Sequence, residues 1–551
     1  MGTRFIEPQK NKKLNIGKVA GAVLLVVLVV VGIYFLVTNN GEENNEEIKT
    51  DISQEKPDVI VSEKNIDTVV AEFGGTITER IKEDTCFVSK DGTDYTVYSD
   101  GTVITGKVIP WKGEESKPAI DSAGNINIYN AGEFAWVANR VITGEKNFSG
   151  VTITLRSHLD LGARKNNEGV WEGNTWTPIV GFLTNDASAN TETTDDTVDI
   201  VNENLKRFDG VFNGNGFSIR GVKIDSDKNY QGLFGYQSGT ITDLTIIASY
   251  IKNASESAGI LVGLNEGTIR NCKVENVEVN GKEKIGGIIG NAMTNSIIEG
   301  CEISNSLING EKYVGGVVGY INNNVSLQNI TNKANVKGEE YVGGMAGITF
   351  FGTDLKNVIN IADNIEGKEY VGGLIGYSQS QIENSYSNNG IVKGNNYVGG
   401  LVGFNYLMGN ITDSFNANKV IVTGDNAGGI VGVNNGSVSN CYNKGTIDST
   451  LTENLRIGGV CGQNLSESYI NTSYNIGMID NMNYAGGLVG ADFGTISNSF
   501  TIDNCLKKDT EDLDYRKTSE EMKNNVLSDL GASFKVDSSN INEGYPILNW
   551  Q

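Results

Sequence analysis

Histidine is almost absent from this chain of 551 residues, which contains only His158. A His-Glu-x-x-His zinc site needs two histidines, so that class of metallopeptidase is excluded. His158 lies in a stretch, 151–161, where apolar and polar residues alternate. The alternation places His158 and Asp160 on the outward face of a strand, and His158 is predicted to be a surface residue rather than a catalytic base. The Asp-x-Asp-x-Asp-Gly loop and the nonapeptide calcium repeat are also absent, including from the acidic insertion at 186–203. We predict no metal site, no cofactor and no catalytic residue.

Positive charge is scarce as well. The chain has 44 Lys and Arg against 67 Asp and Glu, a formal net charge of −23. An acidic surface repels phosphate groups, so neither nucleic acid nor an anionic lipid surface is an expected partner. A polysaccharide lyase or glycosidase would need paired carboxylates on an outer face of the protein. No acidic column recurs from repeat to repeat, so such a surface enzyme is the alternative and a non-enzymatic protein is the preferred interpretation.

Apolar residues at helical spacing are scarce between 230 and 491, which excludes helical repeats. A short sequence motif of apolar residues flanked by glycine, such as GGLVG, recurs there instead. Its ten copies end at Gly235, Gly263, Gly290, Gly319, Gly347, Gly376, Gly403, Gly432, Gly462 and Gly490, which are 27 to 30 residues apart. So regular a period indicates one small unit stacked on copies of itself. Short Val- and Ile-rich runs between Gly and Asn clusters predict an all-β, right-handed parallel β-helix of about ten 28-residue coils.

The repeats and the segment before them resemble a known family. The GGLVG motifs are followed by Asn-Ser or Asn-Cys pairs, as at Asn384-Ser385 and Asn440-Cys441, and the segment 134–224 contains WTPIVGF and FDGVFNGNGFSIRG. Over residues 120–551 the chain is similar to bacterial surface proteins with GLUG repeats. Such repeats occur in adhesin-like proteins and beside the protease module of immunoglobulin A metallopeptidases. The resemblance implies a surface rod, and the single histidine excludes the metallopeptidase.

The amino-terminal region predicts a membrane anchor. Residues 19–37 (VAGAVLLVVLVVVGIYFLV) carry no charge and are long enough, as a helix, to cross the hydrocarbon core. Five Lys or Arg against one Glu precede this segment, and four Glu follow it at 42–47. This asymmetry predicts a single-pass cell-membrane protein with a cytoplasmic amino terminus and an extracellular bulk. A cleaved signal peptide is the competing interpretation, although no small-x-small cleavage site follows.

The remaining chain divides by composition. We predict a cytoplasmic tail (1–18), the transmembrane anchor (19–37), an acidic flexible stalk (38–59), a small β module (60–115), an N-terminal cap with irregular first coils (116–227), the GLUG-repeat β-helix (228–505) and a C-terminal cap (506–551). The pattern at 95–104 predicts a hairpin in the β module.

Both caps are predicted to contain a helix. Asn130 with Glu133, and Thr518 with Glu521, form capping-box patterns that open helices running to Ile142 and to Gly531. The closing GYPILNW segment is expected to cover the last coil.

The six cysteines are predicted to be inert buried thiols. Cys272, Cys301 and Cys441 occupy a column that other coils fill with serine, and Cys461 fills a slot that others fill with valine or isoleucine. Only Cys272 and Cys301 lie at matching positions of adjacent coils, where a disulfide is the alternative.

One column suggests a binding surface. Six residues before the final glycine of four consecutive repeats stand Tyr313, Tyr341, Tyr370 and Tyr397. Stacked coils would align these rings in an aromatic ladder. The ladder either stabilises the rod or binds a glycan or a host or cell-surface protein, since tyrosine combines an apolar ring with a polar tip. We predict a membrane-anchored, non-enzymatic adhesion or ligand-binding rod, with a purely structural envelope spacer as a further alternative.

Overall fold

The computed structural model describes residues 64–166, 168–182, 205–449, 456–480, 485–506 and 515–551. The predicted transmembrane segment 19–37, the predicted stalk and the acidic insertion at 186–203 therefore lie outside the described residues. Within the described ranges, no helix is long and apolar enough to cross a membrane.

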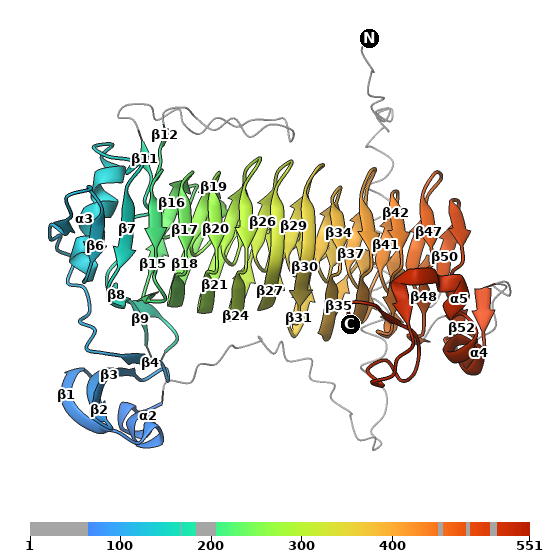
Figure 1. Ribbon diagram of the computed structural model, residues 1–551, viewed down its shortest axis with the longest axis horizontal. Coiled ribbons are helices and arrows are strands. Elements are labelled where there is room, and N and C mark those ends of the chain that lie inside the picture. The colour runs from blue at the N-terminus through green and yellow to red at the C-terminus, as the bar shows by residue number, and fades with distance from the viewer. Residues whose placement is uncertain (1–63, 167, 183–204, 450–455, 481–484, 507–514) are drawn as a thin grey trace, which may run out of the picture. The chain divides into compact units, whose positions relative to one another are not determined.

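The described chain is an all-β, right-handed parallel β-solenoid of about 12 turns (Figure 1). One of its faces is a ten-stranded parallel sheet to which each repeat contributes one strand. These strands are β16 (Phe234–Gln237), β19 (Val262–Asn265), β22 (Ile289–Ala292), β26 (Val318–Ile321), β29 (Ala346–Thr349), β33 (Ile375–Ser378), β37 (Val402–Asn405), β41 (Val431–Asn434), β46 (Cys461–Asn464) and β50 (Val489–Asp492). The parallel β-helix is thus confirmed, and irregular coils before β16 make it longer than the ten coils expected.

The first coils contain no complete GGLVG motif. They are built from β6 (Ile126–Ile128), β7 (Thr152–Leu155), β8 (Leu159–Asp160), β13 (Val211–Asn213), β14 (Ser218–Arg220) and β15 (Lys223–Asp225). Their strands pair in parallel with those of the following repeats, for example β13 with β17 (Thr240–Thr242). The solenoid therefore starts about 100 residues before its first regular repeat.

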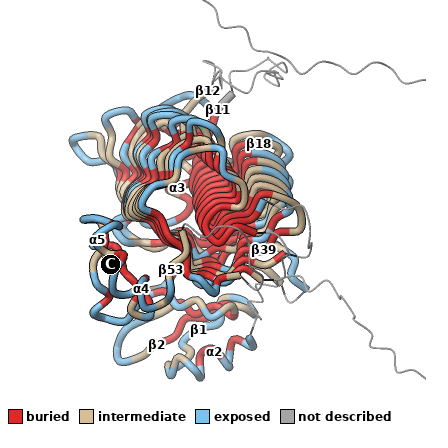
Figure 2. Tube along the Cα trace, turned by 90° about the vertical axis from the view of Figure 1, so that its right-hand side faces the viewer, coloured by how far each residue is buried: buried red, intermediate tan, exposed pale blue. Residues whose placement is uncertain are grey.

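The interior combines aliphatic columns with ladders of buried amides. Val and Ile side chains from every coil form one continuous core. In Figure 2 the residues coloured as buried repeat from coil to coil along the solenoid. Asn416 Nδ2 donates to Asn443 Oδ1 at 2.9 Å, and Asn443 Nδ2 donates to Asn475 Oδ1 at 2.8 Å. Each amide also bonds to the backbone of its own coil, as Asn443 does with Gly445. Stacking therefore satisfies the buried amides of Asn416 and Asn443 and holds their coils in register.

An amphipathic helix packs on the first coils. Helix α3 (Ala131–Ile142) begins at Asn130, whose side chain accepts from the backbone N–H of Glu133 at 3.0 Å. Phe134 on its buried face stacks on Trp176, with ring centroids 5.0 Å apart. The predicted helix is confirmed, and its side chains are continuous with the core of the solenoid.

A small antiparallel module precedes this helix. It consists of α2 (Ile66–Phe73), β1 (Thr76–Lys82), β2 (Thr85–Lys90), β3 (Thr93–Tyr98) and β4 (Val103–Thr105), in sheet order β1-β2-β3-β4. The β3–β4 pair is the hairpin expected from the sequence. Helix α2 was not predicted; it is only eight residues long and is capped by Asn65 and Gly74.

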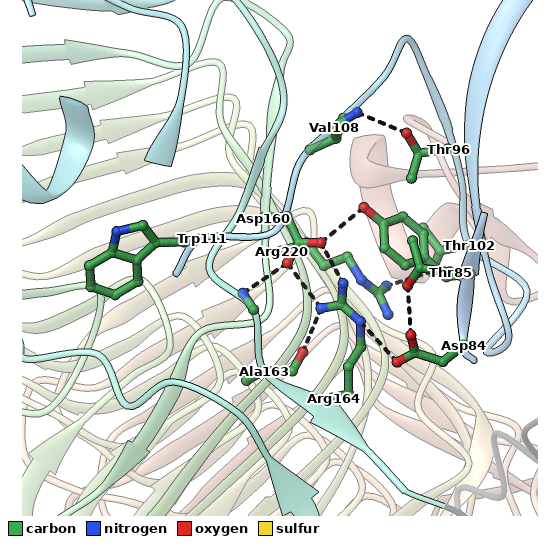
Figure 3. A network of polar contacts seen from close by, with 12 residues as sticks. Asp84, Thr85, Thr96, Thr102, Val108, Trp111, Asp160, Ala163, Arg164 and Arg220 are labelled. Carbon is green, nitrogen blue, oxygen red and sulfur yellow. Dashed lines mark hydrogen bonds and ion pairs between the residues drawn. The ribbon is translucent and has the colours of Figure 1, made fainter. Parts of the chain in front are cut away.

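The module contacts the first coils through buried charges (Figure 3). Arg220 Nη2 lies 2.5 Å from Asp100 Oδ2, and the Tyr98 hydroxyl donates to Asp160 Oδ2 at 3.2 Å. Figure 3 shows Arg164 paired with Asp160 and with Asp84 of the module. Burial alone would raise the pKa of Asp160, but the Arg164 and Arg220 guanidinium groups hold it below its ordinary value.

The outward face on which the sequence places Asp160 is therefore not exposed to solvent at this position. The strand alternation places its side chain outward from the coil, but the β module covers that position and leaves it fully buried. His158 is half-buried; its Nδ1 accepts from the Ser218 backbone N–H at 3.0 Å and lies 2.8 Å from the Ser218 hydroxyl. Burial lowers the pKa of His158.

The C-terminal residues lie against the side of the solenoid. The capping box of Thr518 and Glu521 is present, but it opens a helix α4 of only six residues (Ser519–Asn524). A short α5 (Leu527–Leu530) and a 3₁₀ turn (Gly531–Ser533) follow, so the predicted continuous helix to Gly531 is interrupted. The closing residues cover several coils laterally, rather than the last coil alone, because the aromatic column that they contact runs along the rod.

All six cysteines are buried and free in the structure. Burial raises the pKa of the Cys441 and Cys461 thiols. Both observations agree with the predicted packing role.

Candidate functional site

The four predicted tyrosines form a continuous stack, here called the open ladder. Each is the second residue of a short strand: β25 (Lys312–Gly315), β28 (Glu340–Gly343), β32 (Glu369–Gly372) and β36 (Asn396–Gly399). The ring centroids of Tyr313 and Tyr341 are 5.1 Å apart, those of Tyr341 and Tyr370 are 4.7 Å apart, and those of Tyr370 and Tyr397 are 4.7 Å apart. The stacking expected from the repeat spacing is therefore present.

The backbone at the open ladder is left-handed. The φ angles of Tyr313, Tyr341, Tyr370 and Tyr397 are 56°, 56°, 54° and 56°. Residues other than glycine and asparagine adopt this region at a cost of about 1–2 kcal/mol. The next coil has Asn426 at the same position, with φ 61°. Tyrosine is thus retained in four coils where a smaller residue would fit the backbone better, which points to a role for the rings.

A second aromatic column runs beside the open ladder. Tyr320, Ile348, Tyr377 and Phe404 are paired in register on adjacent strands of the ten-stranded sheet. The Tyr377 ring packs edge-on against Tyr341 at 6.0 Å and against Tyr370 at 6.1 Å, with 75° between the planes in both cases. It also stacks on Phe404 at 5.5 Å. The second column therefore supports the open ladder from one side.

Further aromatic residues extend this surface to the next turn of each coil. The Tyr406 ring lies 5.5 Å from Tyr377, and the Phe350 ring lies 5.3 Å from Tyr320. The adjoining turn residues Phe351, Leu407 and Met408 are 52%, 53% and 66% exposed. The open ladder, the second column and these turn residues are together called the aromatic patch. It occupies the yellow to orange coils of Figure 1, and a contiguous apolar patch with a polar rim is typical of a binding surface.

Charged groups border the aromatic patch. Lys312 Nζ lies 4.7 Å from the ring centroid of Tyr313, and Lys284 Nζ lies 4.8 Å from that of Tyr320. At the other end Arg456 pairs with Asp425. Burial raises the pKa of Tyr341, and the nearby tyrosines and Glu340 raise it further, so this hydroxyl stays protonated at neutral pH.

A second stack on the rod provides an internal comparison. Tyr386, Phe415, Tyr442 and Tyr474, here called the covered ladder, stack with centroids 4.8, 5.0 and 5.1 Å apart. The closing residues of the chain cover them. Trp550 lies over Tyr386 and Phe415, and Phe534 contacts Tyr474. Tyr442 and Tyr474 are consequently fully buried, whereas Tyr341, Tyr370 and Tyr397 remain partly exposed.

The second column and the covered ladder were missed from the sequence. A signal for the second column was present, because an aromatic residue directly follows the final glycine at Tyr320, Tyr377 and Phe404. The covered ladder stands at the residues that follow the Asn-Ser pairs, as Tyr386 does. Each period holds several such columns, and the sequence does not indicate which is covered.

Within the described ranges, no group of three or more His, Cys, Asp or Glu side chains is positioned to hold a metal ion. A cleft of about 1000 Å³ lies between the β module and the first coils. Four of the five cations that line it are paired: Lys64 with Glu72, Arg80 with Asp67, Arg164 with Asp160, and Lys165 with Glu278. The fifth, Lys82, is exposed. The aromatic patch therefore remains the strongest candidate for a functional surface.

Comparison with known proteins agrees with this architecture. Residues 394–421, which include Tyr397 and Phe404, match the family model of the GLUG motif. The chain carries the GLUG motif. The resemblance predicted from the repeats is thereby confirmed.

Two relatives share part of the sequence. A Gly-rich membrane protein of Evansella cellulosilytica is 31% identical over 17% of this chain and 15% of its own length. The halomucin of Haloquadratum walsbyi is 36% identical over 18% of this chain and 1% of its own length. The chain thus spans less than a fifth of either relative.

A solved structure was also found. It is a Bacteroides ovatus protein described as a candidate immunoglobulin A1 protease, 16% identical, with a TM-score of 0.31. The alignment covers 79% of this chain and 96% of that one.

Proposed function

We propose that this chain is a non-enzymatic cell-surface protein that binds a partner on another surface through its aromatic patch. In this proposal the predicted segment 19–37 anchors the chain in the membrane, and the solenoid presents the patch to the partner. The observation behind this proposal is that one aromatic ladder is covered by the chain's own C-terminal residues and the other is left partly exposed. The GLUG motif and the names of the relatives, a membrane protein and a halomucin, support a surface location.

The partner belongs to one of two classes, a glycan or a protein of a cell surface. Tyrosine and phenylalanine side chains supply large contact areas at low entropic cost and are enriched in binding surfaces. The net charge of −23 makes nucleic acid an unsuitable partner.

The test is a double substitution in the middle of the open ladder, Tyr341→Asn with Tyr370→Asn. Asparagine suits the left-handed backbone and occurs naturally in this column at Asn426, so the solenoid should still fold. The matched control is Tyr469→Asn, which removes a 54% exposed tyrosine elsewhere on the rod. Binding of the full chain to glycan arrays and to host or neighbouring cells is measured together with thermal melting.

We expect the double variant to lose binding while it melts within a few degrees of the wild type, and the control to bind normally. Unchanged binding by a folded double variant would remove the open ladder from the binding surface. Release of soluble product from glycans would instead identify the protein as a polysaccharide lyase or glycosidase. Failure of the wild type to bind any glycan or cell would favour a structural spacer.

A further inference from the structure

We infer that the partner of the aromatic patch is an extended protein segment with aromatic and basic side chains. This inference rests on the proposed function and selects one of its two partner classes. Three features of the patch support it: the orientation of its rings, the manner in which the covered ladder is occupied, and the charge along its rim.

The rings of the open ladder present their edges and hydroxyl tips more than their faces. Tyr341 and Tyr370 are parallel within 2°, and Tyr370 and Tyr397 within 9°. Each ring therefore covers much of the face of the next, with an offset of about 3 Å if contact occurs at about 3.5 Å. A sugar ring needs a free aromatic face to stack on. The positive edges and hydroxyl tips of the rings instead suit the carbonyl oxygens of a peptide backbone.

The covered ladder shows how such a stack accepts a peptide. Trp550 lies over Tyr386 and Phe415 with centroid distances of 6.2 and 6.0 Å, and its Nε1 donates to the carbonyl oxygen of Asp413 at 2.8 Å. The ladder hydroxyls also bond to the covering peptide: the Tyr474 hydroxyl donates to the carbonyl oxygen of Pro546, and Gln551 Nε2 donates to the Tyr442 hydroxyl at 2.9 Å.

An aromatic, irregular peptide is thus the ligand that this chain already uses for a ladder of the same spacing. The open ladder offers the same groups. The hydroxyls of Tyr341, Tyr370 and Tyr397 make no hydrogen bond to another described residue, so they are available to a peptide backbone or to water.

The charge beside the open ladder adds a requirement for basic residues. The two positions before Tyr313, Tyr341 and Tyr370 carry a net negative charge, whereas two asparagines precede Tyr397. The charged residues are Glu311, Lys312, Glu339, Glu340, Lys368 and Glu369. Lys368 pairs with Glu339 at 2.6 Å, while Glu340 is exposed next to Tyr341. Lys312 already places its ammonium group 5.9 Å from the Tyr341 ring centroid. A partner with Lys or Arg beside its aromatic residues would complement this rim.

Selection from a phage library of random linear peptides tests the inference. The full chain, purified in detergent, serves as the target, and phage that bind the Tyr341→Asn/Tyr370→Asn variant are removed first. We expect the recovered peptides to be enriched in Trp, Tyr or Phe together with Lys or Arg. Synthesised recovered peptides should bind the double variant at least about tenfold more weakly than the wild type.

A second variant tests the charged rim without disturbing the rings. Glu340→Gln with Glu369→Gln should weaken the recovered peptides about two- to fivefold at low salt, and the difference should vanish near about 0.5 M salt. Lys312→Gln is the control, because it removes a positive charge instead of a negative one. It should strengthen the binding of the recovered peptides or leave it unchanged.

The failure of this inference is distinguishable from the failure of the proposed function. If no peptide is recovered but glycans bind the wild type and not the double variant, the patch is a glycan site and the inference is wrong. If peptides without basic residues are recovered, the charge argument is wrong. If neither peptides, glycans nor cells bind, the inference and the proposed function both fail.

Discussion

The final glycines of the repeats that carry the open ladder pack against the backbone of its strands, as Gly376 shows. A Cβ atom added at Gly376 would lie 2.5 Å from the carbonyl oxygen of Tyr370 and 2.6 Å from the backbone nitrogen of Val342. Both are backbone atoms, which cannot rotate away as a side chain does. The backbone of β33 is therefore packed directly under that of the open ladder, where only glycine fits. The constant spacing of the rings follows from the parallel pairing of β25, β28, β32 and β36.

Gly376→Ala should destabilise the solenoid by about 3 kcal/mol, because the methyl group forces two strands apart in a close-packed core. Equilibrium unfolding in urea measures the change. The control is Gly216→Asn, since Gly216 has a φ of 79° and no atom within 4 Å of an added Cβ. Asparagine tolerates that conformation, and we expect a loss below about 1 kcal/mol. Equal stability of Gly376→Ala and the wild type would show that the backbone at Gly376 is not close-packed against the open ladder.

Elements with a local signal were predictable from the sequence. The capping residue Asn130 with the apolar face of α3 and the turn between β3 and β4 are features of a few consecutive residues, and both were found as expected. The eight-residue α2 was missed because so short a helix carries little periodicity. The break between α4 and α5 was missed because their apolar residues continue a helical pattern through Val526. The burial of Asp160 depends on a module 60 residues earlier, which no local pattern reveals.

The junction between the β module and the first coils should fail when Asp160 is neutralised. Asp160→Asn leaves the buried Arg164 and Arg220 guanidinium groups without their shared anion, and loss of one partner of a buried pair costs about 3–5 kcal/mol. Limited proteolysis within residues 64–108 should accelerate, and stability measured in urea should fall. Asp94→Asn, which removes a more exposed partner of Lys107, should have little effect.

The same junction predicts a dependence on pH. The pKa of Asp160 is lowered in the folded state. Its charge therefore stabilises the fold above the unfolded pKa of about 3.9, and this contribution is lost as the pH falls through the folded value. The wild type should lose stability below about pH 4, and Asp160→Asn should lose less over the same range. Acid titrations of the two proteins are followed by circular dichroism. Equal loss of folded protein with falling pH in both would contradict the stabilising role of the Asp160 charge.

At the scale of the whole molecule, the repeat period predicts a stacked solenoid. The structure agrees because every coil buries its apolar side chains against the coils next to it. The surface of the rod was less predictable. Each period places many columns on the outside, and whether a column is exposed depends on where the chain's ends lie, as the covered ladder demonstrates. The open ladder was identified from its repeated tyrosine alone, while its support by Tyr377 and Phe404 required the register of the neighbouring sheet.

The membrane topology stays a prediction of the charge asymmetry around residues 19–37. External protease on intact cells should remove an epitope tag at the carboxyl terminus and spare one placed before Arg4. Detection of both tags after permeabilisation is the control for expression. Protection of both tags on intact cells would contradict the predicted orientation.

The register of the solenoid predicts which deletions it tolerates. Ser378 pairs with Asn405 in the ten-stranded sheet, so removal of residues 378–404 brings Asn405 into the place of Ser378 and shortens the rod by one coil. Because each coil contacts only its neighbours, the shortened protein should still fold. Removal of only residues 378–390 joins strands of different faces, and every later coil then loses its register. Circular dichroism and thermal melting of the two deletions distinguish them. Equal damage by both would mean that the coils do not act as exchangeable units.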